Sequence, residues 1–293
     1  MNFEDIAIRA RQNLTAWQKI SDTAKSLSAL QIKAVISDYF ASTDTPPDTA
    51  VLRHLAESLL DMTAGGAPST AKNREAIAFL DALLDSYSLP LPEEHSLPPQ
   101  PLPQGPLTVA HFESSIFADA TARFSPLVGN LTSLPTESFT AAADEVSNGK
   151  ATFALLPIED DAEGKLTRFY EQIDRFELHV IAALDIVARH DGKQVRVALV
   201  GKNRIDLAAD ERPRALECLL FEEDRYSLAT LLDTANAIGL SLRRIDSLPI
   251  FYREDGFSKH LVFEGPEQLC RKLHTYVTIF MPRTSVTAEY VLL

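Results

Sequence analysis

Apolar residues recur at helical spacing over the first ninety positions of the chain. One amphipathic run, from Thr49 to Met62, follows Pro46-Pro47, and proline suits the first turn of a helix. Another run begins after the break AGGAPST, where Ser69 or Thr70 can cap a helix. We therefore expect residues 1–88 to form a helical domain that serves packing or dimerisation.

Seven of the chain's 17 prolines fall in the text LPLPEEHSLPPQPLPQGP, residues 89–106. Proline restricts the backbone angle φ and has no amide hydrogen to donate, so a proline-rich segment favours an extended conformation over a packed element. We expect residues 89–106 to be an extended linker that marks a domain boundary.

Strand and helix patterns alternate beyond this segment. We expect strands at Leu107–His111, Ala151–Pro157, Glu177–Val187 and Gln194–Gly201, and helices at Ser115–Arg123, Thr136–Asn148 and Lys165–Arg175. Gly149 follows the second helix, where glycine commonly ends a helix. Alternation of this kind is typical of a mostly parallel sheet with helices packed on it, so residues 107–206 are expected to form one α/β domain.

The C-terminal part has a different order of elements. We expect strand, helix, strand, strand, helix and strand at Ala215–Glu222, Ser227–Ile238, Leu240–Tyr252, Lys259–Phe263, Pro266–Phe280 and Val286–Leu292. Two βαβ crossovers in a short stretch are typical of a ferredoxin-like sandwich. The expected fold class is thus α/β and α+β, with residues 214–293 as the last domain.

Composition and charge narrow the classes of partner. Hydrophobic residues make up 45% and charged residues 24%, as in an ordinary globular protein. The net charge of −13 argues against nucleic acid or an anionic membrane surface, although a small anion needs only a few local donors. The start MNFEDIAIRARQ lacks the apolar core of a signal peptide, and no apolar run is long enough to span a membrane. We expect a cytoplasmic protein.

Metal and cofactor motifs are missing from the sequence. Cys218 and Cys270 have no metal-ligand spacing and are expected to be core thiols. The seven histidines are scattered, and His111 and His179 are expected to be satisfied core or edge residues. No glycine-rich nucleotide loop or hydrolase motif is present, so we expect no metal and no other cofactor.

Two stretches resemble the prephenate dehydratase family. Pro157-Ile158-Glu159-Asp160 follows a buried strand and resembles that family's Pro-Ile-Glu-Asn turn. Residues 227–250, SLATLLDTANAIGLSLRRIDSLPI, resemble the ACT domain fused to such enzymes. Over residues 107–293 the resemblance implies a periplasmic-binding-protein-like domain that converts prephenate to phenylpyruvate, followed by an ACT domain that binds phenylalanine.

The catalytic residues that the resemblance implies are only partly present. The family has a Thr-Arg-Phe triplet whose hydroxyl takes part in the elimination, but the matching strand reads Val195-Arg196-Val197. Asp160 replaces an asparagine, and an ionised carboxylate cannot donate a hydrogen bond to a substrate carboxylate. The triplet Thr167-Arg168-Phe169 falls on an expected helix and is interpreted as a chance match. Glu159, Asp160 and Arg196 are therefore expected to be the remnant of the catalytic set.

Two further departures affect the shape of the expected site. No glycine-rich turn follows the first strand, and Glu113 there disfavours a dicarboxylate, while Ser114 and Ser115 could donate hydrogen bonds or cap the next helix. Only a short turn lies between Val187 and Val195, where the family inserts a second lobe. A single lobe offers no interlobe cleft that excludes water. The sequence therefore favours a degenerate catalytic domain.

The turns of the ACT-like domain are the expected ligand site. Ser227, Leu228 and the amides that begin the next helix could bind a carboxylate, and Asp246, beside Ser247, could hold an ammonium group. Tyr226 replaces a glycine and crowds this place, so a smaller amino acid or carboxylate is expected. The acidic turn of the α/β domain has no basic neighbour in the sequence and is expected to repel such a ligand.

Three hypotheses follow. The first is a catalytically degenerate prephenate dehydratase-like protein, acting as an amino-acid-sensing or regulatory subunit linked to phenylalanine biosynthesis. The second is an active, divergent dehydratase (a carbon–oxygen lyase), alone or with a partner enzyme that completes its site. The third is a structural interaction protein. An open ferredoxin-like sheet has an edge that association commonly covers, so we also expect a homo-oligomer.

Overall fold

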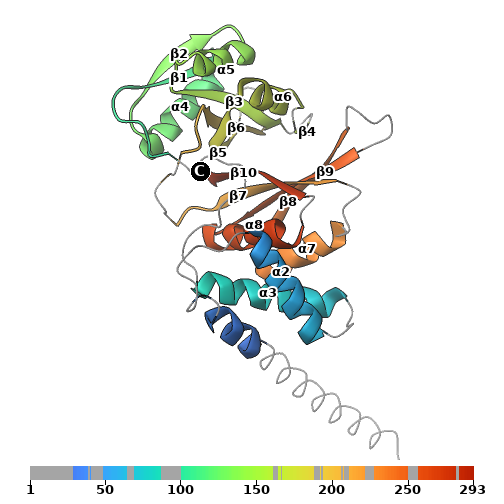
Figure 1. Cartoon of the computed structure of the whole chain (residues 1–293). Helices are drawn as coiled ribbons and strands as arrows, with labels where there is room; N and C mark the ends of the chain where they lie inside the picture. Colours follow the sequence, from blue (N-terminus) through green and yellow to red (C-terminus); the bar gives the residue numbers. More distant parts are fainter. Residues whose placement is uncertain are drawn as a thin grey trace, which may run out of the picture. The chain divides into compact units, whose positions relative to one another are not determined.

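A computed structural model describes residues 29–38, 40, 49–64, 69–86, 100–160, 164–165, 167–187, 192, 194–205, 207, 211–221, 228–249, 257–281 and 284–293. Its helices and strands are labelled in Figure 1. The chain divides into two compact units. The first unit contains Met1–Glu94 and Thr275–Pro282, and the second contains His95–His274 and Arg283–Leu293.

The first unit is helical in its described parts, as expected. It contains a helix at residues 29–38, α2 (Thr49–Ala64), α3 (Ser69–Ser86) and the end of α8 (Glu267–Phe280). Arg53 of α2 donates to the carbonyl oxygens of Ile279 and Thr278, at 3.0 and 2.9 Å. The last carbonyl groups of a helix have no partner within the helix, so Arg53 caps α8.

The second unit contains the remaining elements. They are β1 (Leu107–Phe112), α4 (Ser115–Val128), β2 (Leu131–Thr136), α5 (Phe139–Ser147), β3 (Phe153–Asp160), β4 (Gly164–Lys165), α6 (Thr167–Phe176), β5 (His179–Val187), β6 (Gln194–Gly201), β7 (Arg214–Phe221), α7 (Leu228–Ile238), β8 (Ser241–Pro249), β9 (Phe257–Gly265) and β10 (Thr284–Leu292). Most of them match the predicted elements within a few residues. None of the described helices is long and apolar enough to cross a membrane.

All these strands belong to one sheet, in the order β2-β1-β3-β6-β5-β10-β7-β9-β8, with β4 paired to β3. The expectation of a mostly parallel sheet over residues 107–206 holds for β2, β1 and β3, but β6 is antiparallel to both of its neighbours, β3 and β5. Only the pairs β1–β2, β1–β3 and β5–β10 are parallel. A short connection joins β5 to β6, and Val187 faces Gln194 across the pair. Such a short link can only form a hairpin, which makes the two strands antiparallel.

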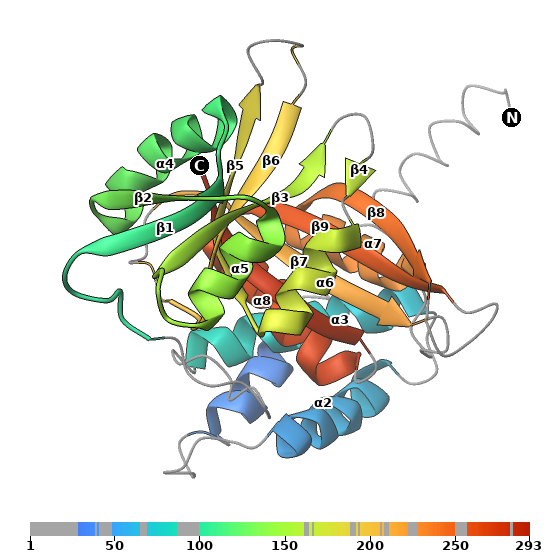
Figure 2. The same ribbon diagram turned by 90° about the horizontal axis from the view of Figure 1, so that it is seen from above.

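Two apolar layers cover the part of the sheet built from β1, β2, β3, β5 and β6. Helix α4 packs on one face through Phe117, Ala120 and Phe124, and α5 and α6 pack on the other. Figure 2 shows α4 on one side of these strands and α5 with α6 on the other. The predicted end of α5 is confirmed, because Gly149 follows the C-cap residue with a φ of +71°.

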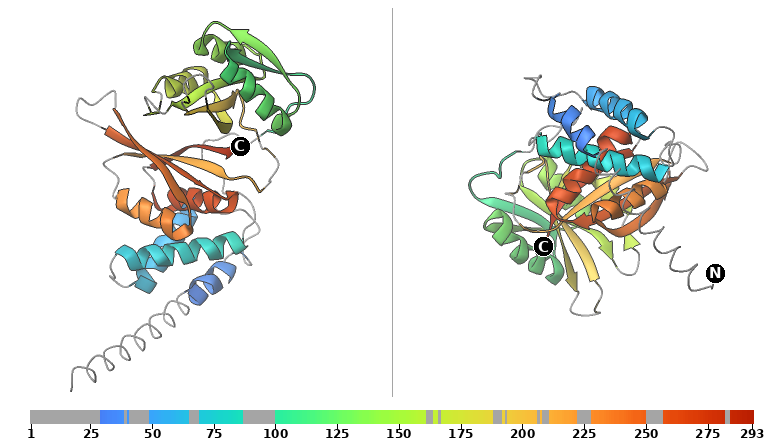
Figure 3. Two further views of the ribbon diagram at one scale, coloured as in Figure 1. Left: turned by 180° about the vertical axis from the view of Figure 1, so that it is seen from behind. Right: turned by 90° about the horizontal axis from the view of Figure 1, so that it is seen from below.

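The C-terminal strands follow the order β10-β7-β9-β8 with antiparallel neighbours, which is the topology of a ferredoxin-like βαββαβ unit. Helix α7 (orange) and helix α8 (red) lie on one face of these strands (Figure 3). The opposite face carries Glu217 and Arg244, which contact Tyr170 of α6 and Glu159 of β3. This polar face is where the candidate site is built.

The second half of the proline-rich segment is attached to the sheet. Gln100 forms a β-bridge with Ile205 and donates its amide to the carbonyl oxygen of Arg204, at 2.8 Å. Leu102 packs against the buried residues beneath α4. The expected extended linker is therefore attached to the sheet at Gln100 and Leu102, although most of residues 100–106 are exposed. Residues 89–99 lie outside the described part of the chain.

Candidate functional site

Strand pairing places three charged residues of the α/β part side by side. Arg196 of β6 lies opposite Glu159 of β3 on one side and opposite Asp185 of β5 on the other. Residues that face each other in adjacent strands project from the same face of a sheet. The remnant pair Glu159 and Arg196, predicted from the sequence, is therefore brought together.

Arg196 is fully engaged with carboxylates. Its Nε and Nη2 donate to the two oxygens of Asp185, at 2.8 and 3.0 Å, and its Nη1 donates to Glu264 of β9, at 2.8 Å. The side chain is only 4% exposed. Paired, two-point hydrogen bonding of this kind is among the stronger polar contacts in proteins. Arg196 thus links the α/β strands to the ferredoxin-like strands.

The protonation states follow from this pairing. Burial alone lowers the pKa of Arg196, but its hydrogen bonds to Asp185 and Glu264 outweigh that effect and raise the pKa overall. Burial alone raises the pKa of Asp185, but the hydrogen bond and charge of Arg196, with the charge of Arg243, lower it by more. Both groups of the pair therefore stay charged at neutral pH.

The network continues through two consecutive arginines of β8. A register shift between Leu242 and Arg244 marks a β-bulge, and both Arg243 and Arg244 reach carboxylates. Arg244 donates from Nε to Asp246 at 2.8 Å and approaches Glu159 with Nη1 at 3.5 Å. Within the described part of the chain, Arg243 makes only longer ion pairs, at 3.7 Å to Asp185 and to Glu264 and at 4.0 Å to Glu159.

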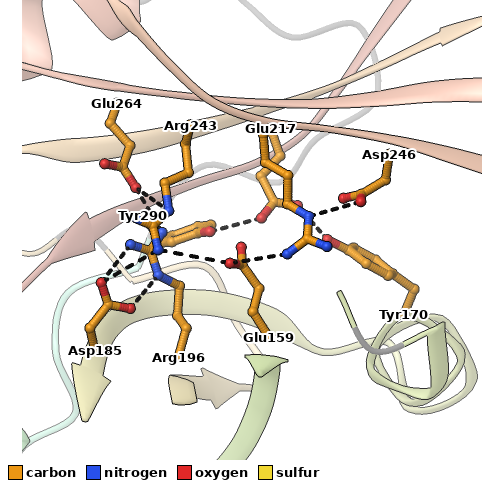
Figure 4. A network of polar contacts seen from close by, with 10 residues as sticks. Glu159, Tyr170, Asp185, Arg196, Glu217, Arg243, Asp246, Glu264 and Tyr290 are labelled. Carbon is orange, nitrogen blue, oxygen red and sulfur yellow. Dashed lines mark hydrogen bonds and ion pairs between the residues drawn. The ribbon is translucent and has the colours of Figure 1, made fainter. Parts of the chain in front are cut away.

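The acidic turn was expected to repel an anion because it has no basic neighbour in the sequence, but in the fold Glu159 has two arginines beside it. Glu159 is part of β3, is only 7% exposed, and lies near Arg243 (Figure 4). It also lies near Arg244, and both arginines are remote in sequence. Its Oε1 and the Oδ2 of Asp246 are buried, and neither accepts a hydrogen bond from any described residue. Such orphaned acceptors are uncommon in folded proteins.

A second cluster of hydrogen bonds centres on Glu217 of β7, which is 2% exposed. It accepts from the hydroxyls of Tyr290 and Tyr170, at 2.8 and 2.9 Å, and lies 3.1 Å from Nε2 of His260. Burial, followed by the charge of Glu217 and its hydrogen bond, raises the pKa of Tyr290. Tyr170 belongs to α6, so Glu217 ties this helix to the C-terminal strands (Figure 4).

The other predicted site residues lie elsewhere or are not described. Ser114 is the N-cap residue of α4, but its hydroxyl makes no cap hydrogen bond, and Ser115 is exposed in the first turn. Leu228 begins α7, and Ser247 accepts from Lys259 at 2.7 Å. Tyr226, Ser227 and the side chain of Asp160 lie outside the described residues. The structure thus joins Asp246, not the serines, to Glu159 and Arg196.

The two cysteines and His111 are buried in the structure. Cys218 and Cys270 are buried and unpaired with each other, as expected of core thiols. Burial raises the pKa of the Cys218 thiol, and it raises that of Cys270 to about 12. His111 is satisfied by the hydroxyl of Ser133 and the carbonyl oxygen of Phe112. No cluster of metal-binding side chains occurs among the described residues.

Sequence reasoning missed most of the network: Tyr170, Asp185, Glu217, Arg243, Arg244, His260, Glu264 and Tyr290. A signal was present, because charged residues inside apolar strands are rarely buried unless they are paired. Glu217 within ALECLLF and Asp185 within HVIAALDIV are examples. The sequence could not show which charge meets which, since the partners come from separate strands.

Comparison with known proteins gives likenesses in structure alone. No protein-family model and no curated protein sequence matches the chain. A prephenate dehydratase from Streptococcus mutans is 19% identical with a TM-score of 0.49, over 64% of this chain and 98% of that one. A prephenate dehydratase from Arthrobacter aurescens, solved in complex with L-Phe, is 16% identical with a TM-score of 0.45, over 63% and 90%.

A third solved structure is GqqA, described as a novel type of quorum quenching acylase. It is 14% identical with a TM-score of 0.48, over 63% of this chain and 94% of that one. These three solved structures each match this chain over somewhat less than two thirds of its length.

Proposed function

We propose that this chain is a prephenate dehydratase-like protein without dehydratase activity, which binds a small amino acid or carboxylate and acts as a regulatory subunit. The observation that carries the proposal is the state of Arg196. Arginine recognises a substrate carboxylate through paired N–H donors, and here those donors are bound to Asp185 and Glu264. A substrate would have to displace both carboxylates from a buried position.

Two further features point the same way. Val195 stands where the resemblance calls for a threonine hydroxyl, and a positioned proton donor typically contributes about 10²–10⁴-fold to such a reaction. Strands β5 and β6 form a hairpin in place of a connection through a second lobe. The proposed setting is aromatic amino-acid metabolism, phenylalanine biosynthesis in particular, with a homo-oligomer or a partner enzyme as the regulated assembly.

The test is an assay of phenylpyruvate formation from prephenate by the purified chain. We expect the rate to equal the spontaneous rate in buffer, both for the wild type and for Val195→Thr, because restoring the hydroxyl does not release Arg196. Turnover in the ordinary enzymatic range, about 1 s⁻¹ or more, contradicts the proposal and favours an active, divergent dehydratase.

A further inference from the structure

We propose that Glu159 and Asp246 form a binding site for the protonated amine of a small ligand, with Arg244 between them. The inference rests on the proposed binding role and names the chemical group that the site recognises. The two carboxylates come from separate parts of the second unit, Glu159 from β3 and Asp246 from β8. Both contact the same guanidinium group, that of Arg244.

The first argument is the pair of orphaned acceptors. Oε1 of Glu159 and Oδ2 of Asp246 are buried, and no described residue donates to either. Glu159 is 7% exposed, so bulk water cannot take the place of a donor. A buried carboxylate oxygen without a donor is unfavourable, and a charged donor satisfies it best. A primary ammonium group carries three N–H donors, enough to serve both oxygens.

The second argument is the balance of charge. Among the described side chains, the ion-pair network around the site holds four carboxylates (Glu159, Asp185, Asp246 and Glu264) and three guanidinium groups (Arg196, Arg243 and Arg244). In a buried position an unmatched negative charge is costly, and a cation relieves it. An anionic ligand without an amine adds to the imbalance.

Arg243 could bind the carboxylate of an amino acid whose ammonium group lies at Glu159 and Asp246. It makes no hydrogen bond to any described residue, its nearest carboxylate oxygens are 3.7 Å away, and its side chain is 35% exposed. No described residue accepts a hydrogen bond from its N–H donors, whereas those of Arg196 are taken. An α-amino acid places its ammonium group at Glu159 and Asp246 and its carboxylate toward Arg243. We expect amino acids to bind more tightly than the corresponding simple amines.

The ligand also bridges separate strands of the fold. Strand β3 belongs to the α/β part of the sheet, and β8 is the edge strand of the ferredoxin-like part. A group held by both restrains the two parts together, so ligand binding raises the unfolding temperature as well as filling the site.

The experiment is calorimetric titration of the full chain with two matched sets of probes. One set is L-phenylalanine, phenethylamine and 3-phenylpropionate, and the other is L-valine, isobutylamine and isovalerate. In whichever series has a side chain of suitable size for the site, we expect the amino acid to bind best, the amine to bind more weakly and the acid not to bind. The comparison of amine with acid uses the wild type and depends on no substitution.

Variants then locate the site. Glu159→Gln and Asp246→Asn keep the shape and remove the charge, and each is expected to weaken amine binding about tenfold or more. The matched controls are Glu137→Gln and Asp233→Asn, which change exposed carboxylates and are expected to bind as the wild type does. Circular dichroism checks that each variant is folded.

Each outcome bears on the inference. Binding that survives both Glu159→Gln and Asp246→Asn overturns the amine site but leaves the proposed binding role. An acid that binds as tightly as its amine overturns the inference, and so does the absence of any amine binding in both sets. Phenylpyruvate formation overturns the non-catalytic role whatever calorimetry shows, so the two failures are distinguishable.

Discussion

The two ends of the polar network in the second unit differ in how completely their donors and acceptors are matched. At one end Arg196 makes three hydrogen bonds to Asp185 and Glu264. At the other end Arg244 leaves one oxygen of Glu159 and one of Asp246 without a donor. A matched buried network holds structure, whereas a partly matched one is unfavourable until another group completes it. We therefore assign structure to the Arg196 end and binding to the Arg244 end.

The largest loss of stability is expected from a substitution at the Arg196 end of the network. Arg196→Met removes the closest hydrogen-bond donors of Asp185 and Glu264, although both keep a 3.7 Å ion pair with Arg243. Removing one member of a buried ion pair lowers the free energy of unfolding by about 3–5 kcal/mol. Chemical denaturation measures the change. The control is Arg168→Met, on the exposed face of α6, which is expected to stay within about 0.5 kcal/mol of wild type. An equally small change for Arg196→Met would refute a structural role for the Arg196 end.

The next largest loss of stability is expected in the hydrogen-bonded cluster around Glu217, which is tested separately from the arginine network. Glu217→Gln weakens the acceptor of two tyrosine hydroxyls and the partner of His260, so we expect a loss of about 2–3 kcal/mol in unfolding free energy. Tyr170→Phe removes one of these bonds and should lose about 1 kcal/mol. Equal losses for both variants would show that the contacts of Glu217 with Tyr290 and His260 contribute nothing to stability.

A smaller change in stability is expected at the Arg244 end of the network when no ligand is bound. Glu159→Gln gives up ion pairs of 3.5 and 4.0 Å but also removes a buried charge whose Oε1 lacks a donor. These terms oppose each other, so the free energy of unfolding should change by less than about 1 kcal/mol. A loss as large as that of Arg196→Met would mean that both ends are structural.

The smallest expected effect is on the loss of stability in acid, compared between the wild type and Asp185→Asn. The lowered pKa of Asp185 means that its stabilising contribution is present above its ordinary value, 3.8, and is lost as the pH falls through the lower folded value. Denaturation midpoints measured at several values below about pH 4 should therefore fall less steeply in Asp185→Asn than in the wild type. Parallel curves for the two proteins would contradict the pairing of Asp185 with Arg196.

Sequence patterns predicted elements better than they predicted neighbours. The buried strand β3 and the helices around it follow from apolar periodicity, and β6 was placed with Arg196 in it. Strand β2, LTSLPT, was missed because it is polar and contains Pro135, which an edge strand tolerates. The short turn between β5 and β6 is visible in the sequence, and it implies an antiparallel pair, whereas the alternation of strands and helices indicated parallel neighbours.

The candidate site illustrates the same limit. Glu159, Arg196 and Asp246 could each be named from the sequence, but they were assigned to competing sites. Their meeting depends on the register of β3, β6 and β8 and on a bulge in β8 that admits two consecutive arginines. Periodicity shows which face a residue occupies, whereas long-range register is decided by packing between strands that are far apart in the chain.

Nitrogen NMR of the arginine Nε–H groups tests the contrast between the two ends most directly. Signals are assigned by Arg→Lys substitution, and spectra are recorded while the best-binding amine or amino acid is added to the full chain. We expect the Arg196 signal to exchange slowly with water and to stay in place, because its donors are buried and occupied. The Arg244 signal is expected to shift in proportion to ligand bound. A shift of Arg196 with an unchanged Arg244 would contradict the assignment of structure to one end and binding to the other.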